Sequence, residues 1–235
     1  MSGVEKGWGK INTPHEEKYM PESIFVGRDP ELLKEMMGFY SYPEGKIYDV
    51  TANEKRMWKN LTQTNIIFSD VDRNMNPNIQ CDFLNLPFKS NTGSIIIFDP
   101  PHLPEAAGSN KSLKPFVRRY GLDKTTSSDN ISGIFKPFLI EAKRVLKQDG
   151  LIFVKLSDFV HNHKYQWILV DFVNAVRDID GLTATDLRIK NDPSAGNLKS
   201  GKWVNSHHVR KSHCWWIVVR KGKCETKLPL KSMWD

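Results

Sequence analysis

Short runs of large apolar residues alternate along the chain with segments whose apolar residues recur every three to four positions. The short runs predict buried strands, and the segments with helical spacing predict amphipathic helices. In the segment 135–150, for example, one helical face carries Phe135, Phe138, Leu139, Ala142 and Leu146. Gly150 follows at a position where a glycine commonly ends a helix. Apolar strands that alternate with helices predict an α/β fold, with a mostly parallel sheet covered on both faces.

The predicted elements begin at residue 29, after a polar N-terminal arm at 1–28. The first helix has Asp29 or its neighbour as its cap and Pro30 in its first turn. Helices are predicted at 29–40, 135–150 and 165–179, and strands at 46–52, 64–72, 79–84, 93–101, 150–158, 182–189 and 214–222. Length and apolar content fit one domain over residues 1–235.

Two long segments, 104–133 and 190–213, lack a periodic pattern. Loops longer than about 12 to 15 residues in a compact domain are usually functional or disordered. Both segments combine Lys or Arg with Gly, Ser, Asn and an aromatic residue, which is typical either of a surface that contacts phosphates and stacks on bases or of solvated loops. The candidate substrate-binding residues are Lys111, Lys114, Arg118, Arg119, Tyr120, Lys199, Lys202, Trp203, Arg210 and Lys211.

The chain is basic, with 34 Lys and Arg against 27 Asp and Glu, a net charge of +7 and a pI of about 9.2. This excess favours a polyanionic partner. The three cysteines have no disulfide or metal spacing, and neither the "HNH" nor the "HHVRKSHC" segment has the spacing of a metal site. We therefore expect no metal and a reducing compartment. No apolar run approaches the ~20 residues of a membrane span, and the polar start lacks a signal-peptide core, so we expect a cytoplasmic protein without a membrane partner.

Carboxylates follow four successive predicted strands. They are Asp49, then Asp70 and Asp72, then Asp82, then Asp99. Because the carboxyl ends of parallel strands meet at one edge of a sheet, we expect these side chains to lie along a single edge, where ligands bind in folds of this class.

The ordered segments "IYDVTANEKRMW", "IIFSDVDRN", "CDFLNLPF", "SIIIFDPPH" and "FLIEAKRVLKQDGLIFVKLSD" resemble the motifs of class I S-adenosylmethionine-dependent methyltransferases, over about residues 44–160. The segment "DPPH" resembles the Asp-Pro-Pro-aromatic signature of enzymes that methylate exocyclic amino groups of bases in nucleic acids. The resemblance implies a Rossmann-like fold with a seven-stranded, mostly parallel sheet and helices on both faces. It also implies S-adenosylmethionine as the cofactor.

The resemblance also assigns roles to individual residues. Asp49, Thr51 and Ala52 would line the methionine end of the cofactor, and Asn53 stands where the family has a glycine-rich turn. Asn adopts a left-handed conformation more readily than most residues, so it is able to replace a glycine. For the ribose hydroxyls the sequence leaves Asp70 and Asp72 open, with the other acid serving as a turn or cap residue. Asp82, with Phe83 packed nearby, would hold the adenine amino group.

In the catalytic motif, Asp99 and the backbone carbonyl of Pro100 would accept the two N–H groups of the target amino group. Proline fixes φ, so Pro100 and Pro101 would hold that carbonyl rigidly. His102 would stack on the extruded base, at a position where the family usually has a larger aromatic ring.

These assignments predict methylation of an amino nitrogen in DNA, on adenine first and cytosine second. The same chemistry on RNA is the nearest alternative, since both partners are polyanions. A non-catalytic nucleic-acid-binding protein with a methyltransferase fold is a second alternative, and a small-molecule methyltransferase is a third. The sequence leaves the oligomeric state and the target sequence open.

Overall fold

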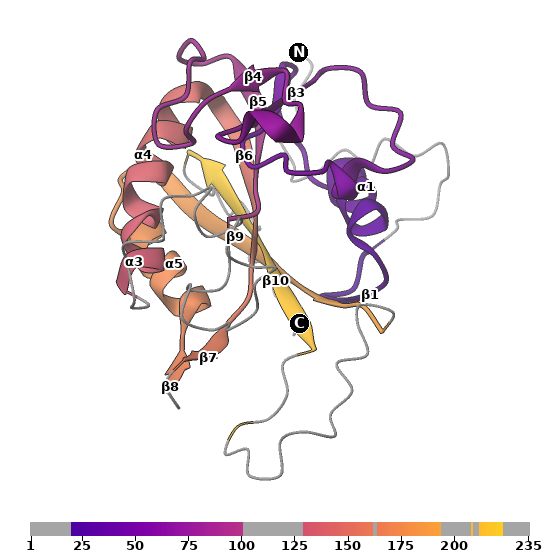
Figure 1. Cartoon of the computed structure of the whole chain (residues 1–235), viewed down its shortest axis with the longest axis vertical. Helices are drawn as coiled ribbons and strands as arrows, with labels where there is room; N and C mark the ends of the chain where they lie inside the picture. The colour runs from indigo at the N-terminus through magenta and orange to yellow at the C-terminus, as the bar shows by residue number, and fades with distance from the viewer. Residues whose placement is uncertain (1–19, 101–128, 162–163, 194–207, 209–211, 223–235) are drawn as a thin grey trace, which may run out of the picture.

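The computed structural model describes residues 20–100, 129–161, 164–193, 208 and 212–222. An eight-stranded sheet in the order β1-β9-β10-β6-β5-β2-β3-β4 runs through the centre of this part of the chain (Figure 1). Its strands are β1 (Ile24–Val26), β2 (Lys46–Asp49), β3 (Ile66–Asp70), β4 (Ile79–Gln80), β5 (Gly93–Phe98), β6 (Leu146–Leu156), β9 (Leu182–Asn191) and β10 (His213–Lys221). A separate hairpin pairs β7 (Phe159–His161) with β8 (Lys164–Gln166).

The strands β2 to β6 run parallel to one another, whereas β10 is antiparallel to both β6 and β9. β1 is parallel to β9 and is the outermost strand beside it, the eighth of the sheet. The carboxyl ends of β2, β3, β4, β5, β6 and β9 therefore share one edge of the sheet. This is the edge at which α/β folds of this kind bind their ligands.

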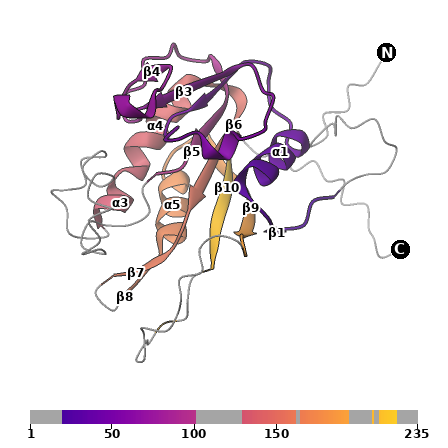
Figure 2. The ribbon, with the colours of Figure 1, turned by 45° about the vertical axis from the view of Figure 1, so that its right-hand side comes forward.

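Helices cover both faces of the sheet, as the sequence predicts (Figures 1 and 2). α4 (Phe135–Val145) and α5 (Ile168–Arg177) pack on one face, together with the short α3 (Asp129–Gly133). α1 (Asp29–Phe39) and the 3-10 helix η1 (Arg56–Trp58) cover the other face. A second 3-10 helix, η2 (Arg73–Met75), follows β3.

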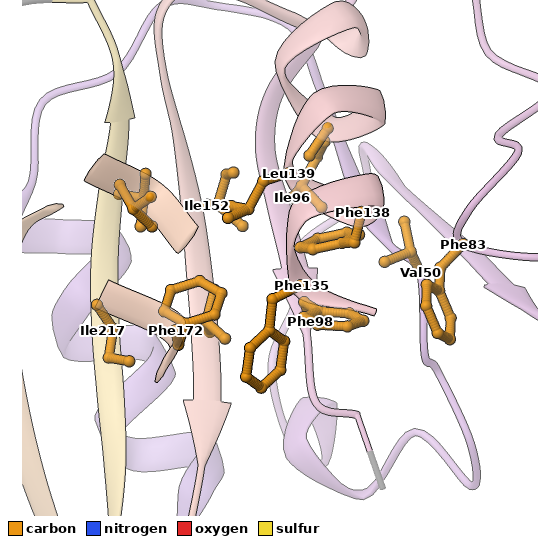
Figure 3. Close-up of a cluster of buried hydrophobic side chains, with 14 of the residues drawn as sticks. Val50, Phe83, Ile96, Phe98, Phe135, Phe138, Leu139, Ile152, Phe172 and Ile217 are labelled. Atoms are coloured by element: carbon orange, nitrogen blue, oxygen red, sulfur yellow. The ribbon is translucent and has the colours of Figure 1, made fainter. Parts of the chain in front are cut away.

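Side-chain alternation along β5 divides the core into two clusters. Ile96 and Phe98 face α4 and α5, while Ile95 and Ile97 face α1. On the first face Phe98 stacks on Phe138 of α4, with ring centroids 3.7 Å apart (Figure 3). Every residue of β5 is buried, which explains why the four residues 95–98 are all large and apolar. The carboxyl end of β5, where Asp99 follows, is therefore held by a fully packed core.

Several boundaries differ from those expected. Residues 24–26 of the predicted N-terminal arm form β1, which makes eight strands where seven were predicted. The predicted loop 104–133 ends in α3, and both ends of the predicted loop 190–213 belong to strands, because β9 extends to Asn191 and β10 begins at His213. Edge pairing and strand extension depend on neighbouring strands, so they leave little trace in local periodicity.

Two helix boundaries were also wrong. α4 ends at Val145, and Leu146 is already extended and begins β6, so Gly150 does not end this helix. A positive φ of 63° falls instead at Asp149, inside β6, where the register between β5 and β6 is irregular. At the start of α5, residues 165–166 belong to β8, since they pair with β7. The predicted strand 79–84 is likewise reduced to β4 at 79–80, because Leu84 N–H turns back to the Asp82 carboxylate.

Candidate active site at the carboxyl edge of the sheet

The predicted carboxylates come together at the carboxyl edge. Asp49 and Asp70 are the last residues of β2 and β3, Asp82 lies two residues after β4, and Asp99 follows β5 directly. Strand register places Asp49 beside Ile97 of β5 and Phe68 of β3. The sequence thus correctly predicts which edge carries these groups.

Asp49 is fully buried and supports the chain that follows β2. Its Oδ2 accepts a hydrogen bond from the indole N–H of Trp58 at 2.6 Å, and its Oδ1 accepts from the backbone N–H of Thr51 at 3.2 Å. Burial raises the pKa of Asp49 to about 7 despite these two donors, and the carboxylates of Asp99 and Asp70 add to the rise. The carboxyl therefore holds η1 against the loop that begins at Val50.

Asp70 is also buried and supports the same loop from the neighbouring strand. Its Oδ2 accepts from the backbone N–H of Asn53 at 2.8 Å, and its Oδ1 accepts from the backbone N–H of Asp72 at 2.9 Å. Asn53 has a φ of 47° and Lys55 a φ of 56°, both in the left-handed region. The left-handed backbone expected at Asn53 is therefore present, and Lys55 adds a second such position that sequence reasoning missed.

Asp72 and Asp82, which also lie along this edge, are more accessible. Asp72 is partly exposed and accepts from the backbone N–H of Asn74 at 2.9 Å, so it caps η2. Asp82 is exposed, and its Oδ1 accepts from the backbone N–H of Leu84 at 2.8 Å. Phe83 points into the core instead, where its ring meets Phe98 edge-on at 5.1 Å (Figure 3).

The backbone of Asp99 is hydrogen-bonded to the loop after β2. Its N–H donates to the Thr51 hydroxyl at 2.7 Å, and Thr51 is buried. Ala52, also buried, donates its N–H to the carbonyl of Ser69 on β3. The loop after β2 and the start of the "DPPH" segment therefore form one connected unit, in which Pro100 is buried.

Lys155 of β6 binds the Asp99 carboxylate, and sequence reasoning missed it. Its Nζ lies 3.2 Å from Asp99 Oδ2 and 3.0 Å from Asp29 Oδ2 of α1. Lys190 of β9 reaches the other oxygen of Asp29 at 2.9 Å. A lysine inside an otherwise apolar strand, "GLIFVKLSD", is the signal that could have identified it.

The remaining predicted site residues lie outside the described residues. They are Pro101, His102, Lys111, Lys114, Arg118, Arg119, Tyr120, Lys199, Lys202, Trp203, Arg210 and Lys211. Within the described ranges, no three His, Cys, Asp or Glu side chains gather as metal ligands would. No helix in the described part of the chain is long and apolar enough to cross a membrane. A cavity of about 290 Å³ lies between α5 and β9, and none of the predicted site residues lines it.

The chain shares its fold with solved methyltransferases at low sequence identity. A SAM-dependent methyltransferase from Leishmania major superposes with a TM-score of 0.51 at 11% identity, over 81% of this chain and 71% of that one. TrmN from Thermus thermophilus gives 0.43 at 14% identity, over 76% and 44% of the two chains. A protein assigned as a DNA modification methylase from the same species gives 0.34 at 12% identity, over 77% and 54%.

The chain thus spans about half the length of the two Thermus thermophilus proteins. No protein-family model and no curated protein matches it. The superposition on the Leishmania major enzyme, together with the strand order and the antiparallel β10, shows a Rossmann-like class I methyltransferase fold.

Proposed function

We propose that the protein transfers a methyl group from S-adenosylmethionine to an exocyclic amino group of a base in nucleic acid, with adenine in DNA as the first choice and cytosine as the second. The observation that carries the proposal is the anchored position of Asp99. Its backbone is held by Thr51 and its carboxylate by Lys155, at the carboxyl edge and directly beside the loop after β2. A hydrogen-bond acceptor fixed in this way suits an amino group that must be oriented before it reacts.

The accessible groups along the edge fit the cofactor. A carboxylate accepts two hydroxyl donors well, and such charge-assisted bonds are strong. Because Asp70 is fully buried whereas Asp72 is partly exposed and Asp82 is exposed, we assign the ribose hydroxyls to Asp72 and the adenine amino group to Asp82. In this proposal the left-handed turn at Asn53 and Lys55 replaces the glycine-rich turn of class I methyltransferases. Asp49, Thr51 and Ala52, assigned to the methionine end of the cofactor, are all buried and hold this loop in place through their hydrogen bonds.

The proposed chemistry relies on positioned acceptors. The lone pair of an exocyclic amino nitrogen is delocalised into the ring, so the nitrogen is a weak nucleophile. Accepting its two N–H bonds at Asp99 and at the carbonyl of Pro100 draws the nitrogen toward a tetrahedral geometry and frees the lone pair. S-adenosylmethionine supplies a sulfonium methyl group that this lone pair attacks. The proton that the nitrogen then loses passes to water.

A basic chain suits a nucleic-acid substrate. Its net charge of +7 favours a polyanion over a small neutral molecule, but DNA and RNA share this property. In duplex DNA the target base must be extruded, at a cost of a few kcal/mol. The basic residues and the aromatic Trp203 of the segments 104–133 and 190–213 remain our candidates for holding the strand, and His102 for stacking on the base.

The test is a transfer assay with S-adenosylmethionine carrying a radiolabelled methyl group. The protein is incubated with duplex DNA or with total RNA, each is digested to nucleosides, and the labelled nucleoside is identified. We expect label in N6-methyladenosine or N4-methylcytidine of the deoxy series. Label only in RNA nucleosides would move the substrate to RNA. Absence of label from both pools would overturn the catalytic proposal and favour a binding protein with this fold.

The Asp99→Ala variant tests the assigned residue. We expect it to abolish transfer and to leave cofactor affinity, measured by isothermal titration calorimetry, within about threefold of wild type, because Asp99 is assigned to the amino group. The matched control is Asp158→Ala, which removes another mostly buried carboxylate, one that accepts hydrogen bonds from Tyr165 and Trp215. Undiminished transfer by Asp99→Ala would show that the acceptor is misassigned.

A further inference from the structure

Lys155 occupies an unusual position for a lysine. It lies near the carboxyl end of β6, and its side chain is only 17% exposed. Leu151 and Phe153, the preceding residues on the same face of the strand, belong to the core under α1. Burying an ammonium group in such surroundings is costly unless it is paired and hydrogen-bonded. Its contacts with Asp99 and Asp29 supply that pairing.

These contacts continue as a chain of ion pairs across four elements. Asp99 after β5 binds Lys155 of β6, Lys155 binds Asp29 of α1, and Asp29 binds Lys190 of β9. Lys190 is 8% exposed and lies 3.9 Å from Asp192. The Asp99 carboxylate, itself 23% exposed, is the end of this chain that belongs to the proposed active site.

The charges around Lys155 keep it cationic. Burial lowers its pKa, but the carboxylates of Asp99 and Asp29 outweigh burial, so the net shift is upward. Cys214 of β10 also faces it, and burial raises the pKa of that thiol to about 11. At neutral pH, Lys155 therefore carries a full positive charge against Asp99.

We propose that Lys155 is a positioning residue for the reaction, and that its ammonium holds the Asp99 carboxylate in the orientation and charge state needed to accept the substrate amino group. The inference rests on the proposed function. A carboxylate has about four acceptor positions, so Asp99 can accept from Lys155 and from a substrate amino group at the same time. Asp29 also binds the Lys155 ammonium, and this second contact restricts the lysine side chain.

The ion pair also defines what Asp99 does in the reaction. A neighbouring cation favours the charged carboxylate and makes it a poorer base. As the C–N bond forms and the C–S bond breaks, the amino nitrogen becomes cationic and must release a proton. With Lys155 beside it, Asp99 orients the nitrogen as an acceptor, and the proton leaves to water.

The experiment compares three variants of the full chain in the radiolabel assay. Lys155→Met removes the charge at similar length, and Lys155→Arg keeps it. Glu35→Gln is the matched control. It weakens the buried ion pair of Glu35 with Arg188 under α1, the helix that also carries Asp29, and leaves the Asp99–Lys155 pair unchanged. We expect Lys155→Met to lower kcat about 10- to 100-fold with unchanged cofactor affinity, and Lys155→Arg to stay within about fivefold of wild type.

A pH profile separates positioning from a merely structural role. In Lys155→Met we expect the acid limb of kcat to move to higher pH, because the cation that favours the charged Asp99 is gone. Glu35→Gln should lower the free energy of unfolding and leave the profile in place. In a protein that already carries Asp99→Asn, Lys155→Met should lower kcat by a smaller factor than in wild type, since there is no carboxylate at position 99 for the ammonium to hold.

The outcomes distinguish this inference from the proposed function. If wild type transfers methyl groups and Lys155→Met matches it in rate and pH profile, the role of Lys155 is overturned while the function stands. The same holds if Glu35→Gln reproduces the full loss and the full shift. If wild type labels neither DNA nor RNA, the proposed function fails, and the role of Lys155 fails with it.

Discussion

The hydroxyl of Thr51 accepts a hydrogen bond of 2.7 Å from the backbone N–H of Asp99, across 48 residues of sequence. This contact joins the loop after β2, proposed to hold the cofactor, to the segment proposed to hold the substrate amino group. Both partners lie at the ends of neighbouring parallel strands, since Asp49 of β2 is paired with Ile97 of β5. The distance between methyl donor and acceptor would therefore depend on one buried hydroxyl.

Replacing that hydroxyl should affect stability and activity together. In Thr51→Val the side chain keeps its shape, but the Asp99 N–H loses its acceptor, and the cost should be about 1 to 3 kcal/mol of unfolding free energy. We also expect at least a tenfold loss of kcat because Asp99 is released. Urea denaturation and the transfer assay measure the two effects. Thr51→Ser keeps the hydroxyl and should restore both; failure of that rescue would contradict the hydrogen-bond explanation.

The buried carboxyl of Asp49 should make stability depend on pH. Its pKa is about 7 in the folded protein and about 3.9 in the unfolded chain, so the folded state holds the proton more tightly. Stability from this group is therefore present below about pH 4 and is lost as pH rises to about 7, by up to about 1.4 kcal/mol per pH unit.

The Asp49→Asn variant isolates this effect. The variant cannot titrate at this position. Its side-chain NH2 replaces an oxygen that accepts from the Thr51 N–H, which lowers the free energy of unfolding by the same amount at every pH. The difference in unfolding free energy between wild type and variant should thus fall from about pH 4 to 7 and then level off. A difference that stays constant over this range would show that Asp49 is ionised in the folded protein.

The turn after β2 should tolerate glycine and reject a β-branched residue. Asn53 has a φ of 47°, which Gly adopts without penalty and Val adopts with strain. We expect the free energy of unfolding of Asn53→Gly to lie within about 0.5 kcal/mol of wild type, and its cofactor affinity to be at least as high. In Asn53→Val the free energy of unfolding should fall by about 1 to 2 kcal/mol, and the cofactor should bind more weakly. Equal stability of the two variants would argue against a left-handed backbone at this position.

The core beneath the site should be sensitive to truncation. Phe138 of α4 is fully buried and stacks on Phe98, which precedes Asp99 directly, so Phe138→Ala should cost about 3 to 5 kcal/mol. Ile140 lies on the same helix but is 55% exposed, and Ile140→Ala should cost under about 1 kcal/mol. Urea denaturation compares the two. Similar losses would contradict the assignment of the buried face of α4.

Local patterns in the sequence determined most of the architecture. The apolar run 95–98 specifies a central strand, and the helical spacing from Phe135 to Val145 specifies a helix on the sheet, because both periods follow from backbone geometry alone. The order of carboxylates after successive strands likewise predicted one edge of the sheet. The left-handed Asn53 was foreseen from the preferences of its residue type.

The tertiary structure alone decided what each of these side chains contacts. The sequence gives Asp49 and Asp70 as candidate cofactor-binding residues, and only the structure shows that their oxygens accept backbone and indole N–H groups. Lys155 and Asp29 are 126 residues apart, and only the packing of α1 over the sheet brings their charges within 3.0 Å. Periodicity describes one element at a time, whereas a hydrogen bond or an ion pair between elements depends on how separate elements meet.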